Sequence, residues 1–144
     1  MKISRRFCLF FLVSCAALFA AEKKSAPAGA GFAGRFAGTW KADEGGAAGD
    51  LEITLRRDER SGWAAEPVFT FEGTRIPGAA KSVEIAGRRL VIVFDWRIQD
   101  TSGQSTVTGT LDGDALGGAY ESKTADGTTR GTWSLRRAPA PQKK

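Results

Sequence analysis

The chain has 144 residues, of which 42% are apolar, with 21 Lys and Arg, 16 Asp and Glu and no His. This length suits one ordinary domain, and the apolar share excludes a fully disordered chain. Because His is both the commonest acid–base group and the commonest metal ligand in proteins, its absence argues against conventional catalysis and against a metal site. We therefore expect no cofactor.

The N-terminal segment has the layout of a secretory signal peptide. Residues 1–6 are basic, residues 7–20 are apolar and uncharged, and small residues follow at Ala20-Ala21. The apolar run has 14 residues, short of the roughly 20 that a membrane-spanning helix needs. We expect a signal peptide over residues 1–21, export to the periplasm or the medium, and no stable membrane span after processing. The alternative is a lipoprotein, because the Leu-Val-Ser-Cys sequence that ends at Cys15 resembles a bacterial lipobox and would place lipid on that residue.

Removal of the signal changes both the charge and the thiol content of the chain. Three cations lie in the signal, which leaves 18 cations against 16 carboxylates. A balance this mild gives no reason to expect a nucleic-acid partner. Cys8 and Cys15 are the two cysteines of the chain, so the exported domain would have no disulfide and would depend on its core for stability.

The two ends of the exported chain differ in composition from its middle. Residues 22–34 are rich in Ala, Gly and Lys, and predict a flexible tether. Residues 29–34 within it match the pattern of a dinucleotide-binding loop, but such a loop works only between a strand and a helix, so we interpret them as tether. Residues 138–144 contain Pro, Gln and Lys and predict a disordered tail. The folded domain is then expected over residues 35–137.

The middle of the chain alternates apolar and polar residues with a period of two. Turn signals with Gly interrupt the alternation near residues 58–62, 76–78, 86–87, 102–103, 112–113 and 126–127. The pattern predicts eight strands, near residues 35–42, 50–57, 65–72, 81–86, 89–98, 105–111, 115–123 and 128–137. Closing such a sheet on itself removes its exposed edges. We therefore expect an all-β domain, an antiparallel up-and-down eight-stranded barrel, with a two-sheet β-sandwich as the alternative.

Short motifs in these strands carry a family resemblance. Phe36-Ala37-Gly38-Thr39-Trp40 resembles the Gly-x-Trp start of calycin barrels, the group that contains lipocalins, fatty-acid-binding proteins and avidins. Residues 108–118 and 133–137 resemble small exported bacterial β-barrel proteins. The resemblance implies a barrel fold, a small apolar ligand, and an Arg of the last strand (Arg136 or Arg137) lying over Trp40.

Large aromatic residues share the inward parity of the expected strands. The candidate ligand-binding residues among them are Trp40, Phe71, Phe94, Trp96, Tyr120 and Trp133. Such rings either fill a core or wall a cavity for an apolar or aromatic ligand, with the Tyr120 hydroxyl as a polar handle. We expect a non-catalytic ligand-binding barrel. The alternative has a filled core and acts as a cell-envelope interaction module on a protein or glycan through its surface. Trp63, beside a turn, is expected at a barrel mouth or on an exposed contact surface.

Charged residues offer little for catalysis or for metal binding. Hydrolysis by paired carboxylates needs two acids held close together, and the candidates Glu72, Glu84, Asp95 and Glu121 all fall on the polar parity of their segments. We therefore expect no enzyme, with a carboxylate-dependent hydrolase as a minor alternative. The two carboxylates of residues 112–114 are too few for a calcium site.

Basic pairs occur at the ends of three expected strands. They are Arg56-Arg57, Arg88-Arg89 and Arg136-Arg137. Charges at such positions protect sheet edges and favour solubility. Gathered at one end of a barrel, they would also attract an anionic envelope surface.

Overall fold

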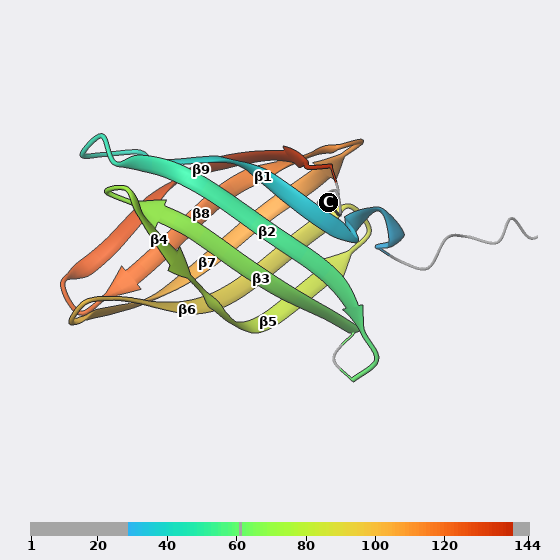
Figure 1. The fold of residues 1–144 in the computed structure, drawn as a ribbon, viewed down its shortest axis with the longest axis horizontal. Helices are drawn as coiled ribbons and strands as arrows, with labels where there is room; N and C mark the ends of the chain where they lie inside the picture. Colours follow the sequence, from blue (N-terminus) through green and yellow to red (C-terminus); the bar gives the residue numbers. More distant parts are fainter. Residues whose placement is uncertain (1–28, 61, 140–144) are drawn as a thin grey trace, which may run out of the picture.

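The computed structural model describes residues 29–60 and 62–139, and almost all of them belong to one antiparallel sheet (Figure 1). The sheet has nine strands in the order β4-β3-β2-β1-β9-β8-β7-β6-β5. Their bounds are β1 (Gly34–Ala42), β2 (Ala48–Asp58), β3 (Gly62–Phe71), β4 (Thr74–Pro77), β5 (Ala79–Ala86), β6 (Arg89–Ile98), β7 (Thr101–Asp112), β8 (Ala115–Thr124) and β9 (Gly127–Arg137). A short 3-10 helix, η1 (Ala30–Phe32), precedes β1. The predicted antiparallel barrel is thus confirmed in preference to the sandwich.

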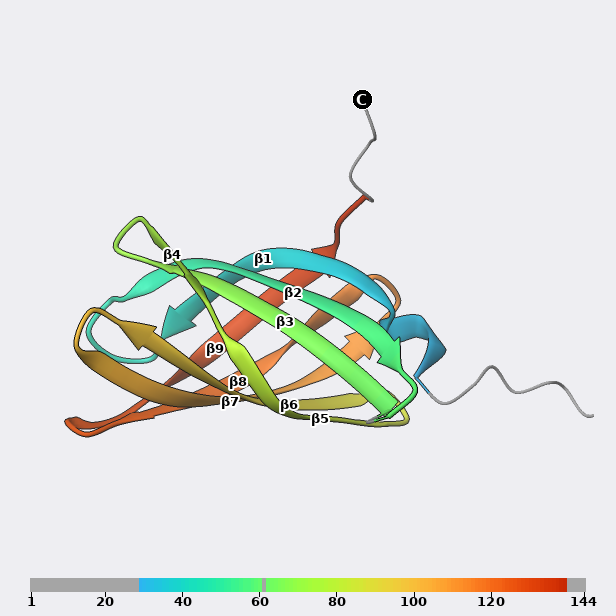
Figure 2. The same cartoon turned by 60° about the horizontal axis from the view of Figure 1, so that its bottom comes forward.

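The barrel is nearly closed by a single bent segment of chain. β4 and β5 are the two end strands of the sheet, yet they are consecutive in sequence with Gly78 alone between them. β4 pairs with β3, β5 pairs with β6, and the Gly78 N–H donates to the Pro67 carbonyl at 2.8 Å. Figure 2 shows this segment crossing from one edge of the sheet to the other. The continuous segment formed by β4 and β5 therefore covers both edges of the sheet and leaves little of either edge exposed.

The strand count differs from the predicted eight because the segment 76–78 is part of the wall and not a turn. Ile76 is buried and pairs with Phe69 in the β3–β4 ladder. The hairpin turns earlier, at Glu72 (φ 49°) and Gly73 (φ 78°). The Gly78 backbone passes so close to the Phe94 ring that a Cβ there would lie 2.5 Å from its Cδ2 atom. A residue without a side chain is thus required at position 78, where the backbone passes the Phe94 ring. From the sequence alone, such a glycine cannot be distinguished from one that marks a turn.

A second predicted turn is also displaced. Residues 102–103 were expected to form a turn, but both belong to β7, where Gly103 pairs with Trp96 of β6. The connection is made instead by Gln99 and Asp100, with Gln99 at a φ of 51°. Most left-handed turn positions are marked by a glycine, but position 99 is a glutamine. The sequence therefore gave no signal for a turn at this position.

The connections divide into two ends because successive strands run in opposite directions. One end, which we call the mouth, carries the loops 43–47, 72–73, 99–100 and 125–126. The other, the closed end, carries η1 and the turns 87–88 and 113–114. In Figure 1 the mouth lies at the left and the closed end at the right.

η1 packs into the closed end and is held there by the last strand. Phe32 is only 1% exposed and belongs to the same core as Phe36. The Arg137 guanidinium donates to the Ala33 carbonyl at 2.7 Å and also to the Gly31 carbonyl. The flexible tether predicted through residue 34 is therefore wrong over residues 29–34, because Phe32 has apolar surface to bury.

Two expectations about aromatic residues need correction at this end. Arg137 does lie over a ring, but that ring belongs to Phe36 at 4.7 Å from the guanidinium carbon, not to Trp40. Trp63 is buried in the core of the closed end, under the guanidinium of Arg57 at 5.0 Å, rather than exposed on a contact surface.

Some predictions concern residues outside the described part of the chain. The signal peptide with Cys8 and Cys15, the tether before residue 29 and the tail from residue 140 lie there. Of the tail, Ala138 donates its N–H to the Arg35 carbonyl at 2.8 Å. Across residues 29–60 and 62–139, no helix has the length and apolar character needed to cross a membrane.

The packing of η1 predicts that Phe32→Ala lowers the free energy of unfolding by about 3–5 kcal/mol, the usual cost of truncating a buried Phe. Phe71→Ala, the same change at a half-buried ring near the mouth, should cost less than half as much. Denaturant unfolding of both variants measures the difference. Equal losses, or a Phe32→Ala variant as stable as the parent chain, would show that η1 is not part of the core.

Candidate ligand cavity

The half of the barrel next to the mouth contains a cavity of about 420 Å³ that is partly open to solvent. Its wall is mainly aromatic and aliphatic, with Phe69, Leu51 and Val107 among the side chains that complete it. Small polar residues of the strand ends, such as Thr101 and Thr129, surround the approach from the mouth, together with Glu44 and Ala47 of the β1–β2 loop. Apolar walls with a few placed polar groups are typical of sites for small molecules.

The structure brings all the predicted site residues together around this cavity. Trp40, Phe71, Phe94, Trp96, Tyr120 and Trp133 all line it. They come from β1, β3, β6, β8 and β9, so only the closure of the sheet makes them neighbours. Their period-two spacing had placed them on the inward face, and the structure adds that they surround a void.

The three tryptophans of the cavity satisfy their indole N–H groups on the barrel wall. Trp40 donates to the Thr70 carbonyl at 3.1 Å, Trp133 to the Ala119 carbonyl at 2.9 Å, and Trp96 to the Ser105 hydroxyl at 2.8 Å. Because a buried N–H without a partner is costly, these bonds hold each ring beside the wall. The Trp96 ring lies over Gly103, where a Cβ would overlap it. The rings consequently leave the middle of this half of the barrel open.

Ring contacts order the remaining aromatic side chains into two groups. Phe71 is stacked on Trp40 with centroids 6.5 Å apart, and Tyr120 meets the same indole edge-on at 5.9 Å. Phe69 contacts Trp96 at 5.8 Å and Phe94 at 6.4 Å. Both geometries are favourable for aromatic pairs. The wall is therefore built from rings that support one another.

A pair of serines forms the most buried polar spot of the cavity, and it was not among the predicted site residues. Ser105 is 4% exposed, and its Oγ lies 2.5 Å from that of Ser122. This bond uses one of the two hydroxyl hydrogens of the pair, and Ser105 already accepts from Trp96. One O–H of the pair is thus left to donate to a molecule in the cavity. The signal in the sequence was Ser105 itself, a polar residue on the inward parity of Val107.

Tyr120 presents a hydroxyl that has no partner among the described residues. The oxygen is buried and makes no hydrogen bond there. Burial raises the pKa of the Tyr120 phenol above its usual value, and the negative charge of Asp43 raises it further. The phenol therefore remains protonated through the neutral range and is available as a hydrogen-bond donor. A buried polar group in this state is poised for a partner that the chain does not supply.

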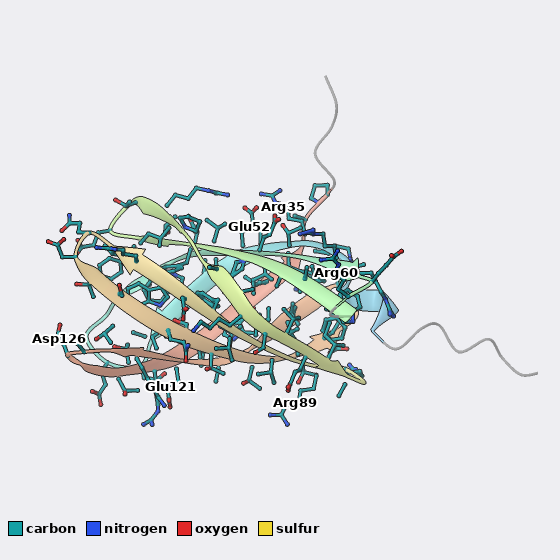
Figure 3. All side chains as sticks on the ribbon, turned by 90° about the horizontal axis from the view of Figure 1, so that it is seen from below. Arg35, Glu52, Arg60, Arg89, Glu121 and Asp126 are labelled. Atoms are coloured by element: carbon teal, nitrogen blue, oxygen red, sulfur yellow. The ribbon has the colours of Figure 1, made fainter. Side chains whose placement is uncertain are left out.

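The carboxylates considered for hydrolysis do not reach the cavity. None of Glu72, Glu84, Asp95 and Glu121 lines it. Glu121 projects from the outer wall (Figure 3), with Arg130 at 2.9 Å and Lys123 at 3.3 Å, and these bonds lower its pKa. Ionised, paired acids on the outside of a barrel are suited to solubility rather than to proton transfer.

Asp95 and Arg97 lie on the outer wall beside a second, shallow groove. This groove has a volume of about 640 Å³, and Gln104 and Lys123 also line it. The Asp95 carboxylate accepts from Gln104 at 3.1 Å and lies 3.2 Å from Lys81; the hydrogen bond from Gln104 is the main cause of its lowered pKa. The charged side chains that line this groove are thus already engaged with protein partners. Throughout the described residues, no three Asp, Glu, His or Cys side chains gather as a metal site would need.

Comparison with known proteins adds no relative to this picture. No protein-family model matches the chain, and the curated proteins and the solved structures give no match either. The geometry and chemistry of the cavity are therefore the basis for assigning a function.

Tyr120 gives a direct spectroscopic test of this geometry, because it is the one tyrosine in the chain. Its raised pKa predicts that phenolate absorbance appears at higher pH in the folded protein than in the chain unfolded by denaturant. Since the folded-state pKa lies above the unfolded one, the associated stability is fully present below the unfolded pKa and is lost as pH rises through the folded pKa. Coincident titration curves would show that the hydroxyl is solvated, and Tyr120→Phe supplies the blank.

Proposed function

We propose that this protein is an exported, non-catalytic barrel that binds a small apolar or aromatic molecule in its cavity. The observation that carries the proposal is the cavity of about 420 Å³, open toward solvent and walled by aromatic rings. Pockets for small molecules begin at about 300 Å³. A barrel with no binding role could have filled this half as it fills the closed end, where Phe32, Phe36 and Leu90 are fully buried.

The polar groups of the cavity narrow the chemistry of the ligand. Tyr120 offers a phenolic O–H, and the Ser105–Ser122 pair offers one more. Both are donors set in an apolar wall, so the ligand that fits has an apolar body and a hydrogen-bond acceptor such as a carbonyl or hydroxyl oxygen.

We also propose that the chain is a calycin-like barrel exported by its N-terminal signal. The Gly-x-Trp motif lies in β1, where Trp40 pairs with Trp133 of the last strand. The guanidinium of Arg137, in that strand, lies over the ring of Phe36, which stands two residues before the glycine of the motif. The basic and apolar character of residues 1–21 supports export.

Binding can be tested with N-phenylnaphthylamine, a neutral apolar dye that brightens when it leaves water. We expect the parent protein to bind it, and Thr129→Trp to weaken binding more than about tenfold, because residue 129 lines the cavity near the mouth. Thr128→Trp is the matched control, since neighbouring residues of a strand face opposite sides and residue 128 does not line the cavity. Fluorescence titration measures all three proteins.

Two outcomes would contradict the proposal. Absence of dye binding to the parent protein would argue for the surface-acting envelope module instead. Equal loss of binding in both Trp variants would place the dye on the outside of the barrel.

The role of the phenol is tested separately with Tyr120→Phe. Phenylbutanone carries an acceptor and butylbenzene does not, while their apolar bodies match. Loss of one neutral hydrogen bond is worth about 1 kcal/mol, so the variant should bind phenylbutanone about fivefold more weakly and butylbenzene with unchanged affinity. Calorimetric titration provides both values; equal affinity of the ketone for both proteins would remove Tyr120 from the site.

A further inference from the structure

The loops of the mouth share a charge pattern that the cavity alone does not require. Each of the four contains a carboxylate and none contains a cation. The carboxylates are Asp43 and Glu44 in the β1–β2 loop, Glu72 in the β3–β4 turn, Asp100 in the β6–β7 turn and Asp126 in the β8–β9 turn. The up-and-down topology gathers them at one end of the barrel, and we refer to them as the mouth carboxylates.

Within residues 29–60 and 62–139, none of the mouth carboxylates takes part in an ion pair, whereas most carboxylates of the walls and the closed end do. Among the paired ones are Glu52, Glu66, Asp95, Asp112, Asp114 and Glu121. Negative charge at the mouth is thus left uncompensated, and a concave site lined by one sign of charge concentrates the field in front of it.

Cations close to the mouth in sequence are directed elsewhere. Arg97 donates its Nε–H to the Gln99 carbonyl at 3.0 Å, and Arg130 and Lys123 pair with Glu121 on the outer wall. Lys41 alternates with Trp40, which lines the cavity, so its strand position faces outward. None of these cations lines the cavity.

The charge of the mouth reaches the cavity itself. Glu44 is one of the residues that line it. Asp43, the next residue, acts electrostatically on the phenol of Tyr120. Immediately inside lie Trp40 and Phe71, stacked on each other. Aromatic faces attract cations, most strongly those of Trp, so rings and carboxylates favour the same kind of guest.

The opposite end of the barrel carries charges of both signs, with an excess of cations. Arg57, Arg60, Arg88, Arg89 and Arg136 are gathered at the closed end together with Glu59, Asp112 and Asp114, and Arg88 pairs with Asp112 at 3.0 Å. Figure 3 shows Asp126 at one extreme of the molecule and Arg60 at the other. A positively charged molecule that approaches the protein is therefore steered toward the mouth.

We infer that the ligand of the cavity is an apolar cation, an amine or quaternary ammonium whose aromatic or alkyl body also carries the acceptor for the donors of the cavity. Its apolar body lies among the rings, and its positive charge lies at the mouth beside Glu44 and Asp43. The inference rests on the proposed function, because it names the class of molecule that the same cavity binds. An anionic ligand such as a fatty acid is disfavoured by the same charges.

Three probes with the same phenylbutyl body separate the possibilities: phenylbutylamine, phenylbutanol and 5-phenylvalerate, which are cationic, neutral and anionic at neutral pH. At low ionic strength, calorimetric titration of the full chain should give the tightest binding for the amine and the weakest for the carboxylate, with about tenfold or more between these two. Added salt should reduce the advantage of the amine over the alcohol, because the charges at the mouth are exposed to solvent.

A charge-removing variant tests the named residues. The double variant Asp43→Asn, Glu44→Gln should bind the amine about five- to tenfold more weakly and the alcohol with unchanged affinity. Glu59→Gln, at an exposed carboxylate of the closed end, is the matched control and should change neither. Thermal melting of both variants confirms that the barrel is folded, as expected for exposed positions.

The outcomes distinguish failure of the inference from failure of the proposed function. If none of the three probes binds, the proposed function fails and the inference fails with it. If all three bind equally, or if the alcohol or carboxylate binds best, the cavity is a ligand site but the mouth does not select cations. A double variant that binds the amine as tightly as the parent chain also overturns the inference.

Discussion

The bonds between the indole N–H groups and the wall of the barrel are the constraint on which the rest of this structure depends. Trp40, Trp96 and Trp133 each donate to an acceptor on a neighbouring part of the wall. A ring that gave up this bond to cross the lumen would bury an unpaired donor. The apolar faces of the indole rings thus remain turned toward the cavity. The hydrogen bonds of their N–H groups favour this arrangement over closer packing of the rings.

The two halves of the barrel consequently have different tasks. At the closed end, Phe32 of η1 is inserted among Phe36 and other fully buried side chains, and Arg137 fastens the segment from the last strand. That end supplies the packing on which residues 29–139, which contain no cysteine, depend for stability. In the mouth half, the aromatic residues line the cavity, and the loops carry negative charge only. The packed core and the cavity are therefore separated along the barrel axis.

Much of this was accessible from the sequence, and what was missed has identifiable physical causes. Period-two alternation reports which face of a strand is inward, so the barrel and the inward rings were predictable. It cannot tell whether Gly78 is a turn or a bend in a continuous wall, since both need a residue without a side chain. The burial of Phe32 was not predicted, because its neighbours in the sequence are the Gly and Ala residues typical of a flexible tether. The cavity and the serine pair depend on distances across the barrel, which the spacing of residues along the chain does not contain. In the sequence, the mouth carboxylates are ordinary turn residues, and only the strand topology shows that they lie at one end of the barrel.

The central claim is that the aromatic half of the barrel is an open site for an apolar guest. Nuclear magnetic resonance of the full chain with butylbenzene tests it most directly, through contacts between ligand protons and assigned indole protons. We predict intermolecular Overhauser effects to the rings of Trp40, Trp96 and Trp133, which line the cavity, and none to Trp63, which is buried at the closed end. Effects confined to outer-wall side chains, or no effects at all at saturating ligand, would contradict the account.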